Sequence, residues 1–296
     1  MNSYSFFKNL AISLRPEQWT KNLIIFAGLI FGQQLFEPTA CLRAAGAFLI
    51  FCGLSGAVYL INDIIDRRAD SHHPLKSQRP IASGKFKLKE AIVSIGLIGT
   101  TALTTAFWLD TKFGFISLGY AVLVITYSTL LKHIIILDVL TISIGFVLRA
   151  AAGAIVLSAP ISYWLLVCTI LLALFLAFSK RRHEIVMLED SAVGHRSSLG
   201  EYSPYLLDQM ISVVAASTLI AYAVYTISPA TTEKFGTDLL GLTVCFPLYG
   251  ILRYLYLVHQ REGGGNPSEL LLRDLPLLLC IVLWALSLVV IIYRPS

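Results

Sequence analysis

Charged residues are scarce in this sequence. Asp, Glu, Lys and Arg make up only 14% of the 296 residues, whereas apolar residues make up 56%. A soluble globular domain typically holds about 25% charged and 45–50% apolar residues. The mean hydropathy is +0.73. This composition excludes an ordinary soluble domain and indicates an integral membrane protein.

Paired cysteines and metal-binding cysteine–histidine spacings are also absent. The five cysteines form no CxxC pair and lie within apolar stretches: Cys41, Cys52, Cys168, Cys245 and Cys280. We interpret them as packing residues, neither disulfides nor metal ligands. The histidines His72, His73, His183 and His195 are expected to face water.

The N-terminus lacks the continuous apolar segment that a signal peptide needs. Instead, apolar residues recur at helical spacing between Lys8 and Arg15, namely Phe6, Phe7, Leu10, Ala11 and Leu14. This pattern predicts a short helix that lies on the inner membrane surface.

Long apolar runs are abundant, and they predict an all-α integral membrane protein formed by a single domain, 1–296. Runs of about 18 or more apolar residues can cross a hydrocarbon core of about 30 Å. We expect nine such spans: 19–36, 40–62, 90–108, 113–131, 138–157, 161–179, 210–228, 236–257 and 274–293. The first is the weakest, because Glu17 and Lys21 crowd its start and Gln33 and Gln34 its end.

Lys and Arg are distributed unevenly over the expected loops. With the N-terminus in the cytoplasm, most of them fall on the inner side, as the positive-inside rule requires. Only Arg43, Lys112, Lys234 and Arg294 fall outside. We therefore expect a bacterial inner-membrane protein with its N-terminus in and its C-terminus out. This topology explains the net charge of +5 better than a nucleic-acid partner does.

A cluster of polar side chains ends the second expected span, in YLINDIIDRRAD, 59–70. Asn62, Asp66 and Asp70 recur every four residues, so a helix places them on one face. Stacked carboxylates near a membrane are unfavourable unless a cation lies among them. Mg²⁺ fits best, because it accepts a few carboxylates and leaves positions for substrate phosphates. The nearby Asp63 either supports these ligands or is a simple helix-end acid.

Cationic side chains follow these acids in the same loop. Lys76 and Arg79 lie between Pro74 and Pro80, which stiffen the loop, and both suit phosphate oxygens. Acids for a metal beside cations for phosphates predict a diphosphate site on the cytoplasmic face. The alternative is a solvated helix end with surface salt bridges.

The pattern N-x-x-x-D-x-x-x-D at Asn62, Asp66 and Asp70 resembles the first signature of the UbiA superfamily of intramembrane prenyltransferases. The resemblance implies nine transmembrane helices around a central cavity that opens toward cytoplasmic caps after helices two and six. The two longest expected inner loops follow spans two and six, in agreement with it.

A second stretch, YSTLLKHIIILDVLTISIGFVLRAAAGA, 127–154, narrows the resemblance. UbiA aromatic prenyltransferases carry a Tyr, a Lys and then a D-x-x-x-D pair here. This chain has Tyr127, Lys132 and Asp138, but Ile142 replaces the second aspartate, and Arg149 follows within the span. These residues resemble the decaprenyl-phosphate phosphoribosyltransferase branch, together with RPEQWTKN at 15–22, HPLKSQRPIASG at 73–84, SKRRHE at 179–184 and GGGNPSELLLRD at 263–274.

The resemblance implies a Mg²⁺-dependent enzyme that transfers 5-phosphoribose from phosphoribosyl diphosphate to a polyprenyl (decaprenyl) phosphate. The expected catalytic residues are Asp66, Asp70 and Lys132, and the expected metal ligands are Asn62, Asp66 and Asp70. The expected donor- and phosphate-binding residues are Lys21, Asn62, Lys76, Arg79, Tyr127, Arg149, Lys180 and Arg181.

Several roles stay open at this point. Asp138 either helps to bind the metal, orients Lys132 or only forms an ion pair with Lys132. The alternative to phosphate binding by Arg149 is an ion pair with Asp138. Gly263 to Gly265 either cradle a phosphate or form a linker. The sequence also leaves open a homo-oligomer and which helices line a groove for the lipid tail.

Two other functions compete with phosphoribosyl transfer. Prenyl transfer from a polyprenyl diphosphate to an aromatic acceptor is disfavoured by Ile142 and the additional cations. A transporter or purely structural membrane protein predicts polar residues at mid-membrane, whereas here they cluster at the span ends.

Overall fold

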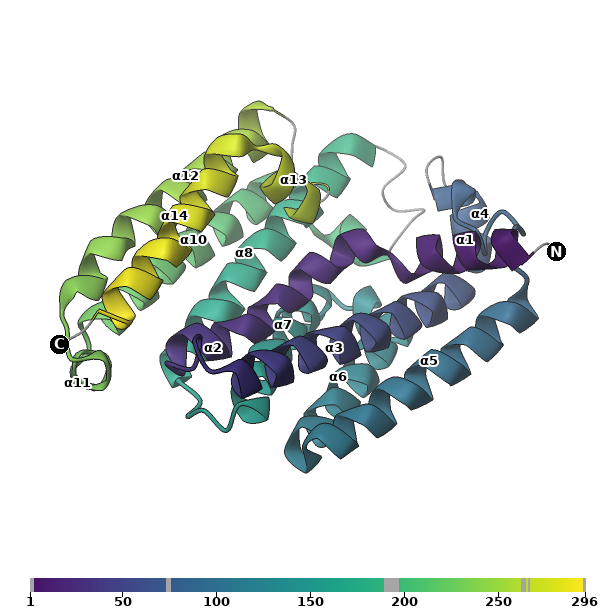
Figure 1. Cartoon of the computed structure of the whole chain (residues 1–296). Helices are drawn as coiled ribbons and strands as arrows, with labels where there is room; N and C mark the ends of the chain where they lie inside the picture. The colour runs from purple at the N-terminus through teal and green to yellow at the C-terminus, as the bar shows by residue number, and fades with distance from the viewer. Residues whose placement is uncertain (1–2, 73–75, 189–196, 262–264, 266, 295–296) are drawn as a thin grey trace.

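A computed structural model describes residues 3–72, 76–188, 197–261, 265 and 267–294. The described chain forms a bundle of helices (Figure 1). The α-helices are α1 Ser3–Leu14, α2 Ala27–Phe31, α3 Pro38–Ile65, α4 Arg67–Ser71, α5 Leu88–Leu109, α6 Thr111–Thr129, α7 Leu137–Val156, α8 Tyr163–Leu188, α10 Pro204–Ile227, α11 Pro229–Phe235, α12 Cys245–Gln260, α13 Pro267–Arg273 and α14 Leu275–Ile292. The 3₁₀ segments are η1 Pro16–Phe26, η2 Lys76–Gln78, η3 Leu131–His133, η5 Ser197–Glu201 and η6 Leu239–Val244.

Eight helical segments in the described part of the chain are long and apolar enough to cross a membrane: α3, α5, α6, α7, α8, α10, η6 with α12, and α14. They confirm eight of the nine expected spans. The expected first span, 19–36, is wrong as a long α-helix. Its residues form η1, then the short α2, and the chain turns at Gln33 with φ 58°.

Polar side chains fix where several spans begin. The carboxylate of Asp110 accepts the Phe113 N–H at the start of α6, and Asp274 accepts the Leu277 N–H at the start of α14. Ser203 does the same for Leu206 of α10. Such caps satisfy backbone donors that the first helical turn leaves without partners.

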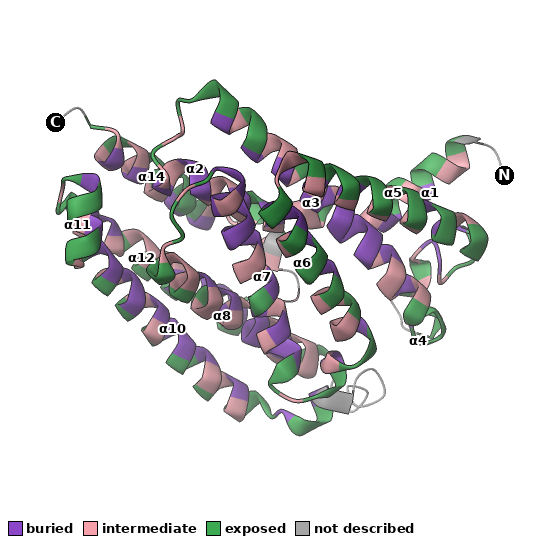
Figure 2. Ribbon diagram, turned by 90° about the horizontal axis from the view of Figure 1, so that it is seen from below, coloured by how far each residue is buried: buried purple, intermediate pink, exposed green. Residues whose placement is uncertain are grey.

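α3 and α7 form the centre of the bundle (Figure 2). Buried residues make up 56% of the most apolar window of α3 and 61% of that of α7, compared with 17% for α5. One core cluster joins α3, α6, α7 and η1 around Phe51, Phe113 and Tyr120, and a second joins α8, α10 and α12 around Phe175 and Tyr254. Residues on the two central helices, α3 and α7, can therefore contact side chains from several neighbouring helices.

η1 packs against α7 at unusually short range. A Cβ built at Gly153 of α7 would lie 2.2 Å from the carbonyl oxygen of Ile25, and one at Gly28 would lie 2.8 Å from the Gly153 carbonyl oxygen. Only glycine permits this approach. The contact holds η1, with Lys21 and Asn22, beside the turn of α7 that carries Arg149.

The N-terminal helix forms as expected and packs over the α3 end of the bundle. Its residues Phe6, Leu10 and Leu14 join a cluster with Leu60, Ile81 and Phe86, while the opposite face exposes other apolar side chains, among them Tyr4, Phe7 and Ile12. The two chain termini lie at opposite ends of the bundle (Figure 1).

Candidate active site

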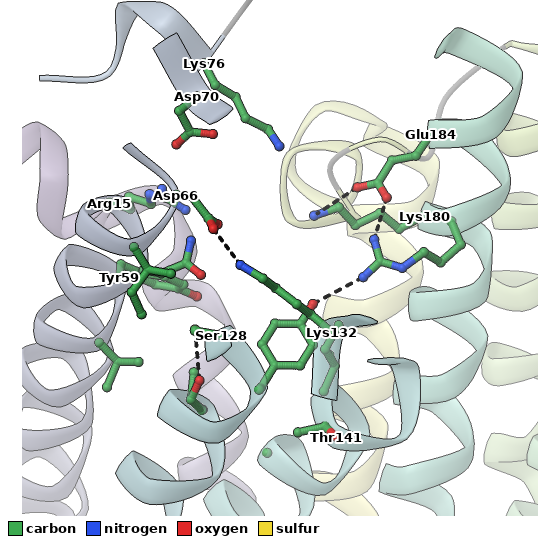
Figure 3. Close-up of a pocket in the computed structure, with 18 of the residues that line it drawn as sticks. Arg15, Tyr59, Asp66, Asp70, Lys76, Ser128, Lys132, Thr141, Lys180 and Glu184 are labelled. Carbon is green, nitrogen blue, oxygen red and sulfur yellow. Dashed lines mark hydrogen bonds and ion pairs between the residues drawn. The ribbon is translucent and has the colours of Figure 1, made fainter. Parts of the chain in front are cut away.

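A cavity of about 690 Å³ opens where α3, α6, α7 and α8 converge with η1 and the loop after α4. Figure 3 shows Asp66, between α3 and α4, and Lys180 of α8 on opposite sides of it, with the Lys132 side chain reaching toward Asp66. All of the site residues expected from the sequence line this cavity: Lys21, Asn62, Asp66, Asp70, Lys76, Arg79, Tyr127, Lys132, Arg149, Lys180 and Arg181. Residues up to 160 positions apart in the sequence thus surround one space.

The acid cluster lies at the junction of α3 and α4, where the helical turn continues. The Asp66 N–H bonds the Asn62 carbonyl at 2.9 Å, and the Asp70 N–H bonds the Asp66 carbonyl at 2.8 Å. These bonds keep the three side chains on successive turns, which brings all of them to the cavity.

Cations from three other segments neutralise these acids. The Arg79 guanidinium lies 2.6 Å from the Asp70 carboxylate and 3.2 Å from Asp63. Arg15 also pairs with Asp63, which is only 2% exposed and lies behind the cavity wall. The Lys132 ammonium lies 2.5 Å from the Asp66 carboxylate. Asp63 therefore anchors two arginines, and Lys132 is poised between Asp66 and the open space.

Asp138 has a different partner from those expected. Its carboxylate accepts from Arg181 Nε at 2.8 Å and from the Tyr202 hydroxyl at 2.9 Å, and the side chain is fully buried. Asp138 does not line the cavity, whereas Arg181 does. Burial first, and the neighbouring Asp138 carboxylate as well, raise the pKa of the Tyr202 hydroxyl, which keeps it protonated as a donor.

Arg149 also differs from its expected alternative, because its partners are neutral. Its guanidinium donates to Asn22 Oδ1 at 2.8 Å, to the Gly145 carbonyl at 3.1 Å and to the Tyr120 hydroxyl at 2.6 Å. The charge also lies over the Tyr120 ring, 4.6 Å from its centroid. Arg149 is therefore held rigidly at the inner wall of the cavity.

Sequence reasoning missed several residues that line the cavity: Arg15, Tyr59, Tyr120, His183 and Glu184. Arg15 had no expected site role, although it opens the RPEQWTKN stretch; its φ of 51° turns the chain between α1 and η1, and its guanidinium lies over the Tyr59 ring. His183, expected to face water, lines the cavity beside Gly265. A signal existed for Glu184, in its i,i+3 spacing from Arg181, with which it pairs. His73, His195, Gly263 and Gly264 lie outside the described residues.

The oxygen donors of Asn62, Asp66 and Asp70 fit a hard divalent cation. No three His, Cys, Asp or Glu side chains converge into a metal cage within the part of the chain that the structure describes. Mg²⁺ does not need such a cage, because it usually keeps waters and binds one or two carboxylates together with substrate phosphates. The donor set therefore suits Mg²⁺ that arrives with a phosphorylated ligand.

Comparison with known proteins places the chain in a family. The UbiA prenyltransferase family model matches residues 22–275. The chain belongs to the UbiA prenyltransferase family. Among curated relatives, this UbiA-family protein is 30% identical to decaprenyl-phosphate phosphoribosyltransferase from Mycolicibacterium smegmatis, over 94% of this chain and 91% of the relative. The enzyme of the same name from Corynebacterium glutamicum is 30% identical over 97% of this chain and 88% of the relative.

A solved UbiA homolog from Archaeoglobus fulgidus, bound to GPP and Mg²⁺, shares the fold with this UbiA-family chain. The TM-score is 0.74 at 19% identity, and the match covers 96% of this chain and 99% of that one. This confirms the expected UbiA-like helical fold. The same homolog has also been solved with Cd²⁺.

Proposed function

We propose that this UbiA-family protein transfers 5-phosphoribose from phosphoribosyl diphosphate to a polyprenyl phosphate, such as decaprenyl phosphate, and releases diphosphate. The observation that carries the proposal is the charge of the cavity lining. Among the residues that the structure describes, eight Lys and Arg side chains line it against three carboxylates, Asp66, Asp70 and Glu184. The shared names of the most similar relatives support the same reaction.

The excess of cations suits a ligand with several phosphates. A terminal phosphate carries about −1.5 to −2 charges near neutral pH. Phosphoribosyl diphosphate has such a group on C5 and a diphosphate on C1, and the acceptor brings a third phosphate centre. A prenyl diphosphate and an aromatic acceptor bring less negative charge. In addition, Ile142 contributes an apolar side chain to the cavity lining, which suits a site with fewer metal-binding carboxylates than in aromatic prenyltransferases.

The cavity residues fall into metal-binding and phosphate-binding groups. Asn62, Asp66 and Asp70 would hold Mg²⁺, which neutralises the diphosphate when bound. Lys132 and Arg79, which lie beside Asp66 and Asp70, would donate hydrogen bonds to phosphate oxygens of the donor. Tyr127, Lys180 and Arg181 complete the donor-binding wall: the Tyr127 hydroxyl accepts from Arg181 at 3.3 Å, and Lys180 lies 3.9 Å from Glu184.

The transfer exchanges one C–O bond for another at C1 of the ribose. The bond from C1 to the diphosphate oxygen breaks, and its electron pair leaves on diphosphate. An anionic oxygen of the polyprenyl phosphate supplies the pair for the new bond, while the ring oxygen stabilises the positive charge at C1. Because the acceptor is already anionic, the step needs no general base. Stabilisation of the departing charge by fixed cations is then the main contribution of the protein.

The topology supports a cytoplasmic donor site. We infer that η1 and α2 together make a ninth crossing, because 3₁₀ helices rise about 2.0 Å per residue and α-helices about 1.5 Å, giving roughly 30 Å. An odd number of crossings agrees with termini at opposite ends of the bundle. The distribution of Lys and Arg then favours a bacterial inner-membrane protein with its N-terminus and cavity mouth in the cytoplasm.

The test uses purified full-length protein in nanodiscs with Mg²⁺, labelled phosphoribosyl diphosphate and decaprenyl phosphate. We expect lipid-linked phosphoribose and one equivalent of diphosphate from the wild type. Asp66→Ala should abolish both products, whereas Asp238→Ala, which removes an exposed acid outside the cavity lining, should not. Turnover of a polyprenyl diphosphate with an aromatic acid, and none of the phosphoribosyl donor, would overturn the proposal.

A further inference from the structure

The cations that line the cavity differ in whether an acid balances them. Arg79 pairs with Asp63 and Asp70, Lys132 pairs with Asp66, and Arg181 pairs with Asp138 and Glu184. Arg15 and Lys180 also lie within ion-pair distance of a carboxylate. This acid-rich part of the cavity carries its own counter-charges before any ligand binds.

Within the described part of the chain, Lys21 and Arg149 lack such counter-charges. Among the residues that the structure describes, the Lys21 ammonium makes no hydrogen bond or ion pair, and the exposed Glu17 nearby remains beyond ion-pair distance. Arg149, 5% exposed, has neutral partners alone among the described residues. The two cations repel each other and line the same cavity. Lys21 is half-buried and Arg149 is buried. Like charges in such a place are costly, and a bound anion relieves both the desolvation and the repulsion.

The Arg149 guanidinium is also prepared for an anion. Its three hydrogen bonds use one N–H on each nitrogen, so one N–H remains on each terminal nitrogen. The rings of Tyr120 and Phe146, 4.6 and 5.2 Å from the guanidinium carbon, restrict its motion. A fixed fork of donors, in a cavity that the Lys21 side chain also lines, matches phosphate oxygens.

We infer that Lys21 and Arg149 form a second anion site in the cavity, which binds a terminal phosphate monoester without a metal. The absence of a carboxylate partner distinguishes it from the acid-rich part that suits Mg²⁺ and diphosphate. This inference rests on the proposed function. In that reaction the monoester is either the 5-phosphate of the donor or the phosphate of the polyprenyl acceptor.

The experiment measures binding, so that it does not depend on turnover. Full-length protein in nanodiscs is titrated with ribose 5-phosphate, with a short-chain polyprenyl phosphate, and with inorganic diphosphate plus Mg²⁺. The variants are Lys21→Met and Arg149→Met, with Arg149→Lys as the conservative change. Lys112→Met and Arg294→Lys, at exposed positions outside the cavity lining, are the matched controls.

We expect Lys21→Met and Arg149→Met to weaken binding of one monoester by about 10- to 100-fold, the range for a lost charged hydrogen bond. Binding of diphosphate with Mg²⁺ should be unchanged, and Arg149→Lys should lose less than Arg149→Met. Weakened ribose 5-phosphate binding identifies the donor phosphate as the ligand, and weakened polyprenyl phosphate binding identifies the acceptor. Lys21→Met keeps the test decisive if Arg149→Met fails to fold, because the Lys21 ammonium bonds no other residue that the structure describes.

Two outcomes would overturn the inference: unchanged binding of both monoesters in Lys21→Met, or an equal loss of diphosphate binding. Failure of the proposed function is a separate result, seen as an absence of phosphoribosyl transfer by the wild type. If the wild type transfers phosphoribose but Lys21→Met binds every probe as the wild type does, this inference is wrong and the proposed function still stands.

Discussion

Replacing Asp138 by alanine separates two roles that its sequence position allows. The resemblance to prenyltransferases permits a metal ligand, whereas the structure places the Asp138 carboxylate outside the cavity lining, paired with Tyr202 and with Arg181, which does line the cavity. In Asp138→Ala the Arg181 guanidinium loses its 2.8 Å partner behind the wall but keeps Glu184. We therefore expect Arg181 to shift within the cavity without a change in metal binding.

The burial of this pair sets the size of the effect. Arg181 is 3% exposed and Asp138 fully buried, and removing one partner of a buried pair costs about 3–5 kcal/mol. Because Glu184 still neutralises Arg181, we expect the cost of Asp138→Ala to lie near the lower end of this range. Tyr202→Phe removes the hydroxyl that bonds Asp138 and accepts the Ile136 N–H at 2.8 Å, a change of about 1–3 kcal/mol. The expected destabilisation of each variant remains below a typical folding stability of about 5–15 kcal/mol, so both variants should fold.

The assay is steady-state transfer in nanodiscs, with donor and Mg²⁺ varied separately. We expect Asp138→Ala to raise the KM for phosphoribosyl diphosphate about 10- to 100-fold, with an unchanged Mg²⁺ concentration for half-activation. Tyr202→Phe should show a weaker form of the same effect and lower thermal stability. Tyr205→Phe, 75% exposed, is the control and should resemble the wild type.

A large increase in the Mg²⁺ requirement of Asp138→Ala, with an unchanged KM for the donor, would refute this reasoning. Asp138 would then act as a metal ligand, and the Arg181 contact would be incidental.

Three further predictions concern packing, charge and metal. Gly153→Ala forces its Cβ against the Ile25 carbonyl and should cost about 1–3 kcal/mol in thermal unfolding, whereas Gly46→Ala, with open space around it, should not. Lys132→Met removes the cation beside Asp66 and should lower kcat by about 10²-fold with little loss of stability, because Asp66 is 28% exposed; a kcat within twofold of wild type would contradict this. Chelation with EDTA should abolish transfer and added Mg²⁺ should restore it, and full activity in EDTA would exclude the metal role.

Features governed by neighbouring residues could be predicted from the sequence. Eight spans follow from apolar runs long enough for a bilayer, since desolvation depends on local composition. The spacing of Asn62, Asp66 and Asp70 follows from the helical repeat, so their arrival at one cavity was predictable. η1 was not predictable, because hydropathy does not distinguish a 3₁₀ segment from an α-helix.

Pairings between distant segments needed the tertiary structure. Asp138 lies 43 residues from Arg181 and 64 from Tyr202, and Arg149 lies 127 from Asn22. By itself, the sequence determined a membrane-spanning helical bundle with acids and cations at the ends of its spans. Only the tertiary structure decided which acid neutralises which cation and which cations remain without one, because charge pairing depends on distances that helix packing sets, at contacts such as Gly153 against Ile25.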